Sequence, residues 1–75
     1  MDGEIQNRVR ALGNPEASDR EKKEAAKILA NLAWNGENKA AIAAAGGIPP
    51  LVALVASGSD SAKEYAARAL WESWQ

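Results

Sequence analysis

The chain has 75 residues, with 9 basic against 10 acidic side chains, a net charge of −1, and neither cysteine nor histidine. So short a chain forms one small domain and buries only about 60–65% of the surface that its unfolded form exposes. The composition excludes a disulfide framework and the commonest soft-ligand metal sites, and the balanced charge predicts no nucleic-acid partner. Association with another chain is the remaining common route to stability for a domain of this size.

The first strong helix signal is SDREKKEAAKILANLAWN, residues 18–35. Ser18 and Glu21 have the spacing of a capping box, in which each side chain accepts a backbone hydrogen bond at the start of the helix. Apolar residues then recur on one face, opposite a face rich in lysine and glutamate; they are Ala25, Ile28, Leu29, Leu32 and Ala33. Asn35-Gly36 is expected to end this helix, and Trp34 to pack at its end against the following segment.

Residues 40–59, AAIAAAGGIPPLVALVASGS, form the longest uncharged run, about as long as a membrane-spanning helix. The GG and PP pairs interrupt the run at its centre, and alanine is too weakly apolar to drive insertion, so no membrane segment is predicted. Two short helices are expected instead. One of the glycines ends the first helix, one of the prolines lies in the first turn of the second, and Gly58 ends the second.

The C-terminal segment SDSAKEYAARALWESWQ, residues 59–75, repeats the pattern of the long helix at an offset of 41 residues. The pairs are Ser18-Asp19 with Ser59-Asp60, Ala25-Ala26 with Ala66-Ala67, Lys27 with Arg68, and Leu29 with Leu70. A weaker repeat at an offset of 43 pairs Ile5, Val9 and Leu12 with Ile48, Val52 and Val55. A period near 40 residues built from helices alone is typical of an α-solenoid.

These segments resemble the armadillo repeat family, most specifically in AAGGIPPLVAL and EAAKILANLA. Residues 35–75 are similar to one nearly complete repeat of three helices, and residues 4–34 to the second and third helices of a preceding repeat. The resemblance implies an all-α fold with a single domain over residues 1–75. That domain is expected to be an armadillo-type solenoid fragment of about one and two-thirds repeats, with roughly five helices in a right-handed superhelical stack.

The third helices of the family line a concave groove that binds extended peptides through asparagines, often with a tryptophan one turn earlier. Carried over by the resemblance, the asparagine positions are Asn31 and Glu72, and the tryptophan positions are Lys27 and Arg68. The family normally has a row of several such asparagines along the groove, and this chain keeps one of them, Asn31. Asn31 is either a peptide contact or an ordinary polar residue on a wet helix face, and the second interpretation is the simpler.

The last helix departs from the first repeat at its end, where Ser73 and Trp74 replace Leu32 and Ala33. Trp71 and Trp74 fall on one side of that helix. We interpret this pair as the anchor of an interface rather than as packing under the chain's own end, because so short a stack has little internal core.

The leading functional hypothesis is a non-catalytic, minimal armadillo module that self-associates through its open solenoid ends. About three repeats are normally needed for a stable stack, so identical chains are expected to cover each other's ends, most simply as a dimer about a two-fold axis. The predicted contact residues are Tyr65, Leu70, Trp71 and Trp74. Tyr65 fits equally well a role in covering its own helix.

The alternative hypothesis is a peptide- or protein-binding fragment that uses the groove, with Lys27, Asn31, Arg68 and Glu72 as contacts. No catalytic, cofactor-binding or metal-binding residue is predicted, because helix capping and the helix dipole already explain the carboxylates near Ser18. The N-terminus has no apolar signal segment, and no localisation is predicted. Alanine-rich helices without Cys, His or Phe fit an engineered repeat protein and equally a trimmed natural fragment.

Overall fold

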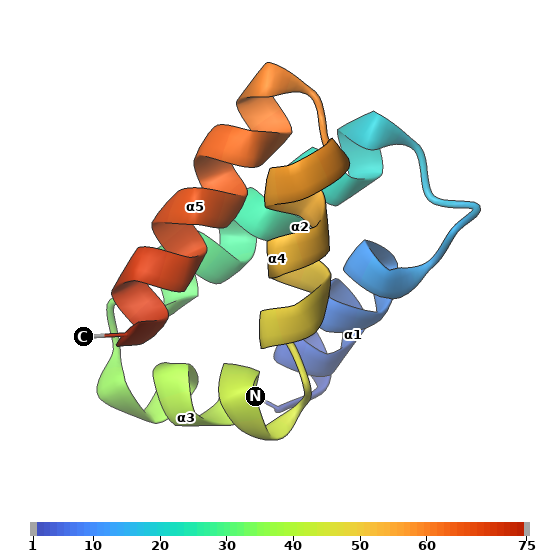
Figure 1. The fold of residues 1–75 in the computed structure, drawn as a ribbon. Helices are drawn as coiled ribbons and strands as arrows, with labels where there is room; N and C mark the ends of the chain where they lie inside the picture. The colour runs from blue at the N-terminus through green and yellow to red at the C-terminus, as the bar shows by residue number, and fades with distance from the viewer. Residues whose placement is uncertain (1, 75) are drawn as a thin grey trace.

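A computed structural model describes residues 2–74, and most of them lie in five α-helices (Figure 1). The helices are α1 (Asp2–Gly13), α2 (Asp19–Leu32), α3 (Gly36–Ala44), α4 (Ile48–Ser57) and α5 (Asp60–Trp74). No strand occurs in the part of the chain that the structure describes, which confirms the all-α class and the expected number of helices. The predicted boundary between the two repeats falls in the turn between α2 and α3, and the division into repeats stays a prediction.

The ends of α2 are set by short-range hydrogen bonds. The backbone N–H of Glu21 donates to Oγ of Ser18 at 3.1 Å, and the N–H of Ser18 donates to Oε1 of Glu21 at 3.4 Å, which confirms the capping box. The other end differs from the expectation, because Ala33 is the C-cap of α2. Asn35 instead caps the start of α3, where its Oδ1 accepts the N–H of Glu37 at 2.8 Å. Asparagine is a favourable N-cap because its side chain satisfies a backbone donor that the helix leaves free.

The uncharged run folds into α3 and α4 with a tight turn between them, as the sequence predicts. Gly46 has a φ of +78°, the left-handed conformation that closes many helices. A Cβ atom at Gly47 would lie 2.8 Å from Cγ2 of Ile42 and 3.1 Å from Cγ2 of Val9, so only glycine lets this turn approach α1 so closely. Pro49 follows in the first turn of α4, where its missing N–H has no helical partner to lose.

Gly58 is the C-cap of α4, as predicted. Among the described residues, no single helix is both long and apolar enough to cross a membrane. The pair α3 and α4 passes on length and composition together, but the two helices are bent by 85° at the break between them.

The helices pack in two layers, and Figure 1 shows α4 and α5 in front of α1 and α2, with α3 across the bottom. Helix α2 is the central element, because it packs along α5 and also against α1. Half of the buried apolar residues are alanines; the full set is Ile5, Val9, Leu12, Ala25, Ala26, Leu29, Ala30, Ala33, Ile42, Leu51, Leu54, Ala62, Ala66 and Ala69. Each buried carbon stabilises the folded state by about 0.8 kcal/mol. A core built half of alanines therefore contributes less to the free energy of unfolding than a core of leucines would.

The buried face of α2 is rotated from the predicted one. Ile28 and Leu32, expected in the core, are only half-buried, whereas Ala26 and Ala30 are almost completely buried. Helix α5 is the main packing partner of α2, and alanines allow two helix backbones to approach closely. A prediction that gives large apolar side chains the most weight therefore places the buried face of α2 on the wrong side, away from α5.

Candidate interaction surfaces

The two C-terminal helices leave apolar side chains open to solvent. Val52 of α4 is 52% exposed, and Trp71 of α5 is 66% exposed. Ala67 is also exposed, while Val55 and Leu70 are half-buried and pack in part against the core. These five uncharged residues are called the C-terminal face below: Val52, Val55, Ala67, Leu70 and Trp71.

The sequence offsets of 43 and 41 pair these five residues with residues of α1 and α2. Their counterparts in α1 and α2 are Val9, Leu12, Ala26, Leu29 and Ala30, which are 8%, 6%, 0%, 0% and 1% exposed. Those counterparts belong to the core, which α4 and α5 complete by packing on α1 and α2. By these offsets the C-terminal face corresponds to that buried surface of α1 and α2, and no further layer of described residues covers it.

The other end of the stack carries charge. By the same offsets, Arg8 and Glu21 correspond to the buried Leu51 of α4 and Ala62 of α5. Nη2 of Arg8 lies 3.6 Å from Oε1 of Glu4, and Glu21 belongs to the capping box. The counterparts of Leu54 and Ala69 at this end are half-buried. The four residues of this end are called the N-terminal face: Arg8, Ala11, Glu21 and Ile28.

The residues predicted for self-association differ in exposure. Trp71 is open to solvent, whereas Leu70 and Tyr65 are half-buried and pack against the core, so Tyr65 at least partly covers its own helix. Trp74 ends α5, but its side chain lies outside the described residues. The expectation that Trp34 packs at the end of α2 is wrong: this side chain is 73% exposed, because the helix ends two residues earlier and the turn directs the indole outward.

The residues predicted for a peptide groove lie on α2 and α5, which pack along each other with their C-terminal ends at the same edge of the molecule (Figure 1). Lys27 and Asn31 are exposed one turn apart on α2. Arg68 is exposed and Glu72 is half-buried, again one turn apart, on α5. The four side chains thus retain accessible surface on neighbouring helices, and their role in binding stays a prediction.

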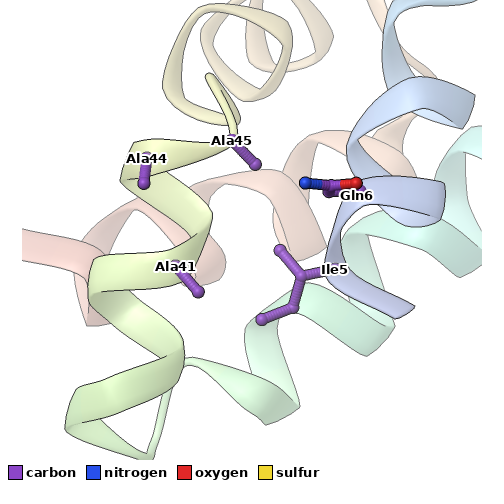
Figure 2. Close-up of a pocket in the computed structure, with 5 residues that line it drawn as sticks. All are labelled: Ile5, Gln6, Ala41, Ala44 and Ala45. Atoms are coloured by element: carbon purple, nitrogen blue, oxygen red, sulfur yellow. The ribbon is translucent and has the colours of Figure 1, made fainter. Parts of the chain in front are cut away.

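A cleft between α1 and α3 was not anticipated from the sequence. Figure 2 shows Ile5 and Gln6 of α1 opposite Ala41 and Ala45. The opening that these residues line has a volume of about 160 Å³. A neighbouring opening of about 480 Å³ shares Gln6 and is also lined by Arg10. Alanine methyl groups make up much of the wall, and alanines carry too weak a signal in the sequence to reveal it. The lining has no nucleophile and no general base, and the described residues hold no cluster of metal-ligating side chains.

The two layers of short helices and their open faces define a small helical-repeat protein. Residues 37–72 match the family model described as Armadillo/beta-catenin-like repeat, a stretch that includes most of α3, all of α4 and most of α5. This matched stretch belongs to the armadillo repeat family, as the resemblance in its sequence implies. Armadillo repeats commonly mediate protein–protein interaction and are generally non-catalytic. No curated protein and no solved structure matches the chain significantly.

Proposed function

We propose that the chain is a non-catalytic interaction module that self-associates through its open solenoid ends into a homo-oligomer, most simply a dimer. The exposure of the C-terminal face supports this proposal, because the counterparts of its five residues in the first repeat are buried. Apolar surface removed from water stabilises by about 25 cal/mol per Å², and a contiguous apolar patch is typical of an interaction site.

The size of the molecule is compatible with a stable interface. A standard interface buries about 800 Å² per partner, which is about one-sixth of the 4724 Å² surface of this chain. That surface is close to the roughly 4,400 Å² expected for a compact monomer of 7.9 kDa. Association would therefore join two compact chains.

The Trp71→Ser variant tests the proposal, with Trp34→Ser as its matched control. Both substitutions remove a largely exposed indole, but only Trp71 belongs to the C-terminal face. The mass in solution is measured by light scattering after size exclusion, over a range of protein concentrations. We expect Trp71→Ser to shift the wild-type assembly toward the monomer and Trp34→Ser to leave it unchanged. Trp74→Ser tests the predicted contribution of the other C-terminal tryptophan in the same way.

A wild-type chain that stays monomeric at every concentration refutes the proposal. An assembly that survives Trp71→Ser shows that this indole does not anchor the interface. If Trp34→Ser reduced the mass and Trp71→Ser did not, the turn after α2 would form the contact and the C-terminal face would not.

The second candidate function is binding of an extended peptide along α2 and α5. The observation that favours it is the accessible surface that Lys27, Asn31, Arg68 and Glu72 retain on two helices packed side by side. Peptide binding is measured by fluorescence anisotropy with a panel of labelled, unstructured peptides of differing charge. This function requires a monomer that saturates with peptide and is weakened by Asn31→Ala but not by Asn7→Ala, an exposed asparagine on α1. Absence of saturation with any peptide of the panel, or equal effects of both variants, contradicts it.

A further inference from the structure

Resting on the proposed self-association, we infer that two copies pair through their C-terminal faces about a two-fold axis. The assembly then closes as a dimer, and the N-terminal faces stay outside. A two-fold interface joins the same patch of both chains, whereas a head-to-tail interface joins two different patches and continues into rings or filaments. The chemistry of the two faces decides between these arrangements.

The contact between the two layers inside the chain is the reference for head-to-tail pairing. There, the buried positions of the first layer are completed by a second layer whose own buried residues include Leu51 and Ala62. A copy stacked head to tail on the C-terminal face would present its N-terminal face in the same way. Arg8 would then occupy the position of Leu51, and Glu21 the position of Ala62.

Head-to-tail pairing would therefore place two charged side chains against a surface without charge. Removal of an ionised group from water costs several kcal/mol even beside a single partner, and an exposed ion pair offsets little of that cost. The contact between Arg8 and Glu4 is of the second kind, since their side chains are 36% and 50% exposed and lie 3.6 Å apart. None of the five residues of the C-terminal face is charged, and the exposed charged residues nearest to them along α5, Glu64 and Arg68, lie outside the face.

The size of Trp71 leads to the same conclusion. Its counterpart Ala30 is 1% exposed, so the packing that covers this position inside the chain fits around a single methyl group. An indole at that position prevents a further layer from binding in the same geometry, because overpacking forces the backbones apart. A two-fold pairing does not have to reproduce that geometry. It gives each Trp71 an uncharged surface of the other copy to bury against, and it does so twice in every dimer.

Opposite charges at Ala67 test this pairing. Ala67 is an exposed residue of the C-terminal face, so its replacement leaves the core untouched. Ala67→Glu and Ala67→Lys each introduce like charges on both sides of a two-fold interface, and we expect each to weaken the dimer at least about tenfold. Mixed in equal amounts, the two variants are expected to form a one-to-one heterodimer. Native mass spectrometry detects it when one variant is labelled with ¹⁵N, which separates the two masses.

Arg8→Gln is the control on the N-terminal face, and we expect it to leave the dimer unchanged. A wild-type chain that remains monomeric contradicts the self-association itself. A wild-type chain that assembles keeps the self-association, but three results then overturn the two-fold pairing. They are a mixture of charged variants that does not associate, a mass that grows beyond two chains, and an assembly that responds to Arg8→Gln.

Discussion

Val9 and Val52 occupy equivalent positions on α1 and α4, and comparison of the two measures directly whether the C-terminal face is covered. Val9 is 8% exposed and Val52 is 52% exposed. Truncation of each to alanine removes the same two carbons from the interior of a helix. The difference between the two costs therefore reports the surroundings of the side chain and not its chemistry.

The magnitudes follow from the exposure of each side chain. Two buried carbons contribute about 1.6 kcal/mol, a cavity adds to this, and the better helix propensity of alanine returns about 0.5 kcal/mol. Val9→Ala should therefore lower the free energy of unfolding by about 1–2 kcal/mol. Val52 is about half as buried as Val9, so its truncation loses about 0.8 kcal/mol of transfer free energy. The better helix propensity of alanine nearly offsets this loss, so Val52→Ala should be almost neutral in the monomer.

Urea denaturation followed by circular dichroism is carried out at a low and at a high protein concentration. A change of 1 kcal/mol moves the midpoint by roughly 0.5–1 M urea in a small domain. At low concentration we expect the midpoint of Val9→Ala to fall well below that of Val52→Ala. At high concentration the dimer buries Val52, so Val52→Ala should become more costly. The difference between the urea midpoints of the two variants should then narrow. Equal costs at low concentration would show that Val52 is already covered, and a gap independent of concentration would show that no second chain covers it.

Ser18→Ala removes the hydroxyl oxygen that accepts the N–H of Glu21, one of the two hydrogen bonds of the capping box, and should lower the free energy of unfolding by about 1 kcal/mol. Ser59→Ala, which removes only a 3.4 Å contact with the N–H of Ala62, should cost less, and urea midpoints that fall equally would contradict this. Gly46→Ala places a Cβ atom at a φ of +78°, which costs about 1 kcal/mol and should lower the melting temperature by roughly 4–8 °C. Gly3→Ala, with no atom near its added Cβ, should not lower the melting temperature; equal melting temperatures for the two variants would refute the role of the left-handed turn.

The features of the fold that act over a few residues were predictable from the sequence. Ser18 and Glu21 form their capping box without help from the rest of the chain. The same holds for the glycine turn between α3 and α4, since Gly46 takes the conformation that other residues avoid. The family was also predictable, because these local signals recur at a fixed period and together with the AAGGIPPLVAL segment specify one repeat.

The features that depend on neighbouring helices were not predictable in the same way. Ala26 and Ala67 have the same chemistry and equivalent positions, yet one is completely buried and the other exposed. Among the described residues, a layer of helices packs over the first position and none packs over the second. The exposure of Trp34 and the cleft beside Ala41 could not be predicted for the same reason. Both depend on where helices end and on how closely the helices pack.

Sedimentation equilibrium of the wild-type chain over a wide range of concentrations tests most directly whether a second copy covers the C-terminal face. The chain has a mass of 7.9 kDa. We predict that the average mass rises with concentration toward twice this value and then remains there. A mass that stays at 7.9 kDa throughout would contradict the self-association of this repeat module.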